Sequence, residues 1–221
     1  MKFGTLAFVI GLIVLFSVEP LAQKRVIAEC TIEFSVTADS NSVEDAPFLA
    51  SLRQSKKFIY VKGVQSRTDF VNPGFTQTVI HRKDAGATIL REFGQNRFMM
   101  RLTQDQWIQE NKKFAGVQMI ELEETRSILN YNCKKARLML TDGQTLDVFY
   151  VPNMVPSVRD YEFQFSIIPG LVLAYESTDQ QNRRVSFIAR RINFSPVQAT
   201  RFEIPTTGYR VLEWVAPDLR D

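Results

Sequence analysis

Few residues in this chain have the types and spacing that catalysis requires. His81 is the single histidine, and it lies between Ile80 and Arg82 in a run typical of a strand. Nucleophilic catalysis needs a nucleophile within reach of such a base, and the sequence has no nucleophile elbow, P-loop or dinucleotide-binding glycine pattern. We therefore predict that the chain is not an enzyme, unless folding gathers His81 with two carboxylates in one cleft.

Two further groups of residues could carry chemistry. The acidic run ELEE at residues 121–124 could supply the two facing carboxylates of a glycoside hydrolase, but a run of this kind is more often a solvated face. Two cysteines and one histidine lie far apart in the chain, which disfavours a zinc site. We predict no metal site and no cofactor.

The cysteines leave two alternatives open. In an exported protein, Cys30 and Cys133 can form one intramolecular disulfide, and closing a loop of about 100 residues would contribute up to about 4–5 kcal/mol. The other alternative is two separate buried thiols, which are common in protein cores.

The charged residues do not indicate a nucleic-acid partner. The chain has 27 Lys and Arg against 24 Asp and Glu, a net charge of +3, and the basic residues are spread along it rather than gathered. Paired basic residues could touch anionic lipid headgroups at a membrane surface; the alternative is that they protect strand edges and keep the protein soluble. These pairs are Lys56-Lys57, Lys112-Lys113, Lys134-Lys135, Arg183-Arg184 and Arg190-Arg191.

The N-terminal segment has the features of a secretory signal peptide. Lys2 is followed by an apolar run over residues 3–18 and by the small residue Ala22, the order found in such signals. The apolar run is shorter than the roughly 20 residues that span a bilayer. We predict cleavage near Ala22, a periplasmic or secreted location, and a single domain over residues 23–221.

Most of the mature sequence alternates as half-buried strands do. Cys30, Ile32 and Phe34 alternate with polar residues, and the pair Asp142-Gly143 lies between two β-rich runs, a strong hairpin signal. Strands are expected over residues 30–36, 56–63, 66–70, 75–82, 87–93, 96–102, 116–129, 133–140, 144–151, 160–167, 171–177 and 183–194.

Two short helices complete the prediction. One follows Pro47, and the other covers residues 103–114, where Thr103 and Gln106 match a capping box. The helices are too few for repeated βαβ units. The fold class predicted is mainly β, a single curved antiparallel sheet or half-barrel with about two short helices.

Three stretches resemble the GLPGLI family of exported proteins of Gram-negative bacteria. They are residues 129–157, which contain CKKA at 133–136, residues 161–176, and residues 202–212. The name-giving motif corresponds to Ile168, Pro169, Gly170, Leu171 and Val172, whereas Ile167 stands where the family has its first glycine. These departures are compatible with a neighbouring subfamily.

The resemblance implies a β-rich half-barrel similar to periplasmic lipoprotein carriers (LolA-like), with no assigned catalytic residue. A curved sheet of this kind could hold a lipid or acyl chain on its apolar concave face. Candidates to line that face are Phe34, Phe58, Tyr60, Phe163, Phe165, Leu171 and Leu173; alternatively, each simply fills the core.

Two functions remain open at this point. The first is an exported carrier or binding protein of the cell envelope for a hydrophobic ligand, with a lipid or lipoprotein as partner. The second is a structural or protein-interaction component of the periplasm or outer membrane. In either case, Pro169 and Gly170 are expected to form a type II turn in which Gly170 takes a positive φ and leads into a strand that is covered on both faces.

Overall fold

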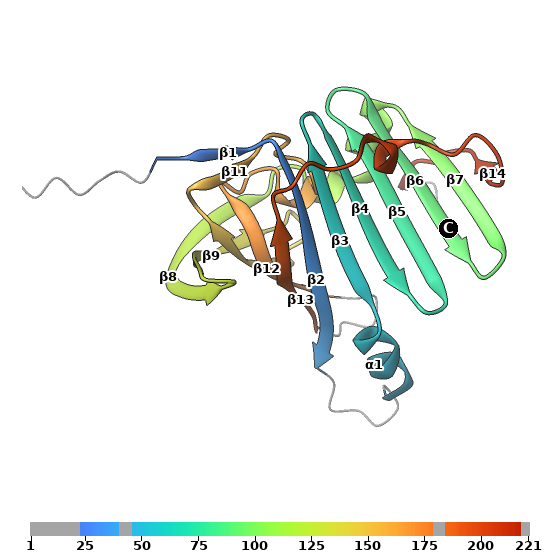
Figure 1. The fold of residues 1–221 in the computed structure, drawn as a ribbon. Helices are drawn as coiled ribbons and strands as arrows, with labels where there is room; N and C mark the ends of the chain where they lie inside the picture. Colours follow the sequence, from blue (N-terminus) through green and yellow to red (C-terminus); the bar gives the residue numbers. More distant parts are fainter. Residues whose placement is uncertain (1–22, 40–45, 179–183, 218–221) are drawn as a thin grey trace, which may run out of the picture.

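The computed structural model describes residues 23–39, 46–178 and 184–217. The predicted signal segment, residues 1–22, lies outside the described residues. Figure 1 shows one large curved sheet, with β2–β7 forming a broad wing and β8–β12 curling round at the other end. Its 12 strands follow the order β14-β7-β6-β5-β4-β3-β2-β13-β12-β10-β9-β8, and β1 and β11 form a small separate sheet. No helix among the described residues is both long enough and apolar enough to cross a membrane.

The elements have the following bounds. The strands of the first half are β1 Arg25–Ile27, β2 Glu29–Asp39, β3 Lys56–Lys62, β4 Gln65–Asn72, β5 Phe75–Arg82, β6 Gly86–Phe93 and β7 Asn96–Leu102. Those of the second half are β8 Gln118–Ile128, β9 Tyr131–Met139, β10 Thr145–Val151, β11 Met154–Pro156, β12 Leu171–Thr178, β13 Arg184–Asn193 and β14 Arg210–Leu212. The helices are α1 Ala46–Arg53 and α2 Gln104–Glu110, with the 3-10 turns η2 Lys112–Phe114, η3 Phe163–Phe165 and η4 Ala199–Phe202.

The predicted fold class is confirmed: the protein is mainly β, with one open curved sheet and two short α-helices. Consecutive strands from β2 to β7 and from β8 to β10 pair antiparallel. The β9–β10 hairpin turns at Gly143, whose φ is +85°, as the pair Asp142-Gly143 predicted. Helix α2 begins at the predicted capping box, because Gln106 N–H donates to the Thr103 hydroxyl and Thr103 N–H to the Gln106 side chain.

The strand expected over residues 160–167 is wrong. This segment belongs to an overhang, residues 157–170, which contains η3 and leads from β11 to β12. Because β12 already lies between β10 and β13, the overhang folds across the sheet. Its alternating aromatics are used differently: Tyr161 and Phe165 are buried in the core and Phe163 is partly exposed.

The positive φ expected at Gly170 is also wrong, since Gly170 is absent from the positive-φ glycines of the described chain. The residue must be glycine for another reason. A Cβ placed there would lie 2.8 Å from Tyr150 Cδ2 and would collide with the Val151 carbonyl oxygen. The motif therefore seats β12 against β10. As expected, β12 is covered on both faces, with Leu171, Val172 and Leu173 fully buried.

The main hydrophobic core fills the curl of the sheet. It joins β2 and β3 to β9, β10 and β12, and its largest fully buried side chains include Tyr150, Phe34 and Phe165. A second cluster joins α2 to β6 and β7 through Trp107, Ala87, Ile89 and Leu102. Between these two packed regions the inner faces of β4 and β5 remain partly uncovered, and this gap forms the candidate site.

Candidate functional site: the concave groove

A groove of about 390 Å³ lies on the inner face of the sheet. Cross-strand register builds its floor, because paired residues share a face: Thr68 pairs with Val79 and Val79 with Ile89, while Phe70 pairs with Gln77 and Gln77 with Arg91. We call this cavity the concave groove. Its floor is Lys57, Thr68, Phe70, Gln77, Val79, His81, Ile89 and Arg91, and its walls are Trp107, Glu110, Asn111, Lys113 and Phe114 on one side and Tyr161, Glu162, Phe163, Gln164 and Phe187 on the other.

Two elements position the walls. Helix α2 packs on β6 and β7, which brings Trp107 over the floor. The overhang is held to β12 by a hydrogen bond of 3.2 Å from the Val172 N–H to the Tyr161 hydroxyl. The two walls meet where the Trp107 and Phe163 rings contact edge to face, with centroids 6.2 Å apart.

A buried ion pair lies at the base of the overhang. Lys57 is 6% exposed; its ammonium group contacts the Glu162 carboxylate and donates to the Tyr175 hydroxyl. The same ammonium lies 5.0 Å from the centroid of Tyr175 and 5.2 Å from that of Phe187. An ion pair at this depth needs such extra partners to offset desolvation, and it ties the overhang to β3.

His81 lies in the floor beside Trp107. Its ring stacks on the indole at a centroid distance of 5.7 Å and an interplanar angle of 27°. Burial lowers the pKa of His81 below its usual range, although the nearby charges of Asp160 and Asp84 act in the opposite direction. The Nε2 atom is 3.5 Å from Asp160 Oδ2, too far for a good hydrogen bond.

Four buried polar atoms in the described chain have no hydrogen-bond partner in the protein, and all four belong to residues that line the concave groove. They are His81 Nδ1, His81 Nε2, Trp107 Nε1 and Glu162 Oε2. Buried polar groups in native proteins are almost always hydrogen-bonded, so each exception requires an explanation. Their concentration at one cavity indicates that the groove is built to meet polar groups of another molecule.

The predicted apolar ligand face is not one face. Phe34, Phe165, Leu171 and Leu173 are 0–1% exposed and fill the core, and only Phe163 lines the groove. Phe58 and Tyr60 lie on the opposite surface of the sheet, because strand alternation separates them from Lys57 and Ile59. The groove residues that sequence reasoning missed, such as Val79 and Ile89, follow the same alternation as His81 along their strands.

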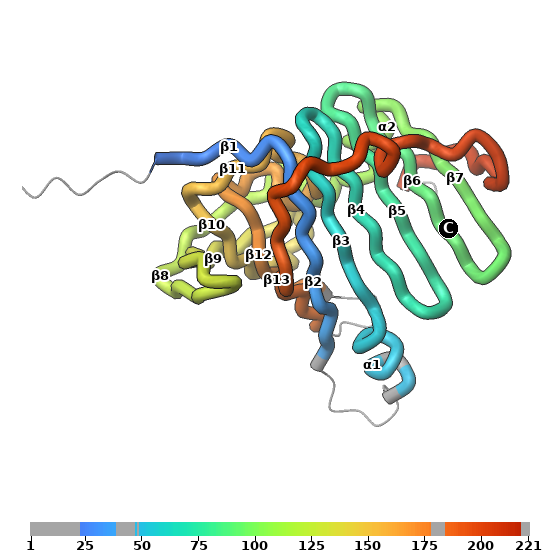
Figure 2. The backbone as a smooth tube through the Cα atoms, viewed as in Figure 1, coloured from blue at the N-terminus to red at the C-terminus, as the bar shows by residue number. Residues whose placement is uncertain are grey.

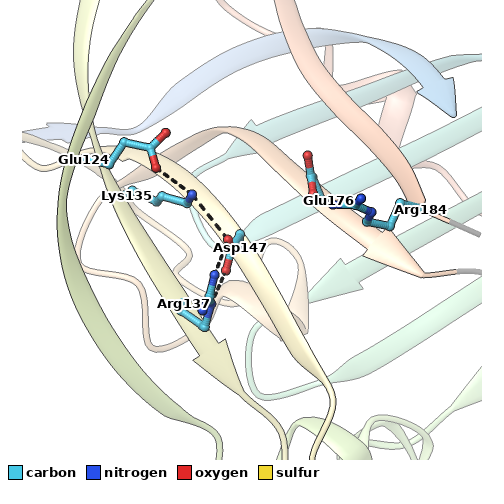
Figure 3. Close-up of polar contacts among 6 residues, drawn as sticks. All are labelled: Glu124, Lys135, Arg137, Asp147, Glu176 and Arg184. Atoms are coloured by element: carbon cyan, nitrogen blue, oxygen red, sulfur yellow. Dashed lines mark hydrogen bonds and ion pairs between the residues drawn. The ribbon is translucent and has the colours of Figure 1, made fainter. Parts of the chain in front are cut away.

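The acidic run of β8 does not form a pair of catalytic carboxylates. The hydroxyl of Tyr150 donates to Glu121 and lowers the pKa of that carboxyl. Figure 3 shows Glu124 joined to Lys135 at 2.7 Å, and Lys135 and Arg137 both joined to Asp147. These ion pairs run across β8, β9 and β10, so the run is a solvated, charge-paired surface. The described residues also contain no cluster of His, Cys, Asp and Glu suited to a metal ion.

Cys30 and Cys133 are both free and buried in the main core, which corresponds to the second of the two alternatives. Burial raises the pKa of Cys30 to about 12 and that of Cys133 to about 11. Since the thiolate is the reactive form, both thiols are inert in the folded chain.

No family model matches the chain, and no curated protein matches it. Among solved structures it is similar to PNGF-II (TM-score 0.46, 14% identity, 85% of this chain and 31% of that one). It is also similar to an uncharacterized conserved protein from Thermus thermophilus (0.48, 6%, 85% and 91%) and to a LolA superfamily protein from Nitrosomonas europaea (0.33, 10%, 80% and 91%). The chain thus spans 31% of the length of PNGF-II. With TM-scores below 0.5, these similarities leave the function to be argued from the groove.

Proposed function

We propose that the chain is an exported, non-enzymatic protein of the cell envelope that binds an acyl chain with a polar head in the concave groove. The observation that carries the proposal is the set of four unpartnered polar atoms on His81, Trp107 and Glu162 in an aromatic-lined cavity. Small-molecule sites combine a mainly apolar lining with a few converging polar groups of this kind.

The polar atoms define the head of the ligand. Trp107 Nε1–H can only donate, the Glu162 carboxylate can only accept, and a neutral His81 ring does one at each nitrogen. A hydroxyl or glycerol ester satisfies both needs, because it accepts from Trp107 and donates to Glu162. A volume of about 390 Å³ is near the lower end of known ligand pockets, which favours a short or medium acyl chain.

The exported location is proposed from the N-terminal segment, with cleavage near Ala22 releasing a single domain over residues 23–221. Membership of the GLPGLI family, or of a neighbouring subfamily, is likewise proposed from the motif Ile168-Pro169-Gly170-Leu171-Val172. A lipid or lipoprotein of the envelope is the partner that suits the groove.

A second candidate function, acid–base catalysis, is favoured by one observation: the concave groove gathers His81 with the carboxylates of Glu110 and Glu162. Against it, neither nitrogen of His81 has a hydrogen-bond partner, so no nucleophile is activated by this base. Glu162 is engaged by Lys57, and Glu110 accepts from Trp214 Nε1 at 3.0 Å. Turnover of p-nitrophenyl laurate that is lost in His81→Ala would establish catalysis; we expect none above the His81→Ala background.

Native mass spectrometry tests the binding function directly. The chain is purified from a bacterial envelope fraction without detergent, and its mass is compared before and after extraction with organic solvent. We expect an extractable acyl adduct. The proposal fails if the native protein has no adduct and also takes up none when it is incubated with 1-monolauroylglycerol.

A further inference from the structure

A second hollow lies on the outer face of the sheet, opposite the concave groove. It measures about 490 Å³, and its base is a grid of paired residues on three adjacent strands. Arg191 pairs with Glu33 and Glu33 with Phe58, while Asn193 pairs with Thr31 and Thr31 with Tyr60. The segment 195–201, which follows β13, forms the other wall, and Figure 2 shows it passing in front of β3 and β4. We call this cavity the outer pocket.

The aromatic part of the outer pocket is held rigidly. The rings of Phe58 and Tyr60 are 6.3 Å apart and nearly parallel, at 18°. Arg201 covers Tyr60, with its guanidinium carbon 4.6 Å from the ring centroid and its Nη1 3.3 Å from the hydroxyl. Tyr60 is therefore 7% exposed, whereas the Phe58 ring remains partly exposed to the pocket. This arrangement presents one flat apolar ring that is fixed from behind.

The polar part of the outer pocket mixes donors and acceptors. Arg191 Nη2 lies 3.0 Å from Glu33 Oε2, and the side chain of Arg191 is 72% exposed. Thr31, Asn193 and Gln198 add hydroxyl and amide groups to the lining. Guanidinium groups only donate and a carboxylate only accepts, whereas hydroxyls and amides do both. The guanidinium groups of Arg191 and Arg201 are thus offset in part by a carboxylate, which disfavours a strongly anionic ligand.

We propose that the outer pocket binds a neutral carbohydrate. The C–H face of a pyranose ring would lie against Phe58, and its hydroxyls would bond Glu33, Arg191 and Asn193, since each hydroxyl both donates and accepts. A nucleotide could stack on the same ring, but its phosphates would lie near the Glu33 carboxylate. This site is separate from the concave groove, and it does not depend on the acyl ligand proposed there.

Saturation-transfer NMR with maltotriose, cellotriose, triacetylchitotriose and mannotriose tests this proposal, with adenosine monophosphate as a non-sugar probe. We expect saturation of at least one trisaccharide, with affinity reduced about tenfold in Phe58→Ala, which corresponds to about 1.4 kcal/mol. Phe58→Leu, which keeps an apolar side chain but not the flat ring, should show a similar loss. Phe93→Ala is the matched control, because Phe93 is 47% exposed on β6 and does not line the pocket.

Three results would overturn the proposal. The first is that the folded protein binds none of the four trisaccharides. The second is that a trisaccharide binds with equal affinity to the wild-type chain and to both Phe58 variants. The third is that adenosine monophosphate alone binds in a Phe58-dependent way.

Discussion

The ring of His81 stacks on the indole of Trp107 at a centroid distance of 5.7 Å, although neither ring has a hydrogen-bond partner for its nitrogens. Stacking satisfies the apolar surfaces of the two rings and leaves their polar atoms beside the groove. Because leaving a buried donor or acceptor unpaired costs about 1–3 kcal/mol, the pair is stable in this form only if another molecule supplies the missing bonds.

His81 should make stability depend on pH near neutrality. Burial lowers its pKa in the folded state, so the unfolded chain binds more protons as the pH falls below about 6.5. The stabilisation is therefore fully present above that pH and is lost as the pH falls through the pKa of the folded state. The chain has one histidine, so His81→Gln should flatten the change in melting temperature between about pH 7.5 and pH 5.5. Equal slopes in both proteins would contradict this assignment.

Removal of the Lys57 ammonium should be costly because it strands a buried carboxylate. Lys57→Met leaves Glu162 without the ammonium group that it contacts, and we expect a loss of about 3–5 kcal/mol in unfolding free energy. In Lys57→Met/Glu162→Gln the buried charge is gone, so most of that stability should return. Urea unfolding of the two variants and the parent measures this; a double variant as unstable as the single one would show that the charge is not the cause.

Gly170→Ala should destabilise the fold through steric overlap rather than through backbone strain. A Cβ at this position meets the Tyr150 ring at 2.8 Å and the backbone of Val151, and overpacking of this kind costs about 1–3 kcal/mol. Gly74→Ala is the control, since nothing lies within 4 Å of a Cβ there. Urea midpoints should fall for Gly170→Ala only, and equal midpoints for the two variants would refute the close approach.

The two thiols should react with an aromatic disulfide reagent only when the chain unfolds. Both are buried and free, and their raised pKa values, about 12 for Cys30 and about 11 for Cys133, leave almost no thiolate at neutral pH. Counting labelled thiols in denaturant without reductant should give two per chain. A count of zero would mean that Cys30 and Cys133 are bonded.

Strand alternation allowed most of the sheet to be predicted, because residues such as Ile32 and Phe34 have one buried and one polar face as neighbours. The overhang was missed because aromatic spacing at Tyr161, Phe163 and Phe165 fits both a strand and a folded turn. The groove could not be predicted from single strands, since it depends on which packed element covers which part of the sheet. Trp107 was expected to anchor its helix, but nothing in the sequence indicated that it would lie over His81.

Energy transfer from tryptophan to a bound dansyl group tests the central proposal most directly. Both tryptophans of the chain are at the concave groove, Trp107 in its wall and Trp214 bonded to Glu110 of that wall. Val79→Glu places a charge in the floor, and Val71→Glu makes the same change at a residue of β4 that is 39% exposed and does not line the groove.

With 11-(dansylamino)undecanoic acid as the probe, we predict saturable dansyl emission on excitation of tryptophan, which 1-monolauroylglycerol displaces. The apparent affinity should fall at least about tenfold in Val79→Glu and stay unchanged in Val71→Glu. Emission that does not saturate, or that is equal in the wild-type chain and Val79→Glu, would contradict binding in the groove.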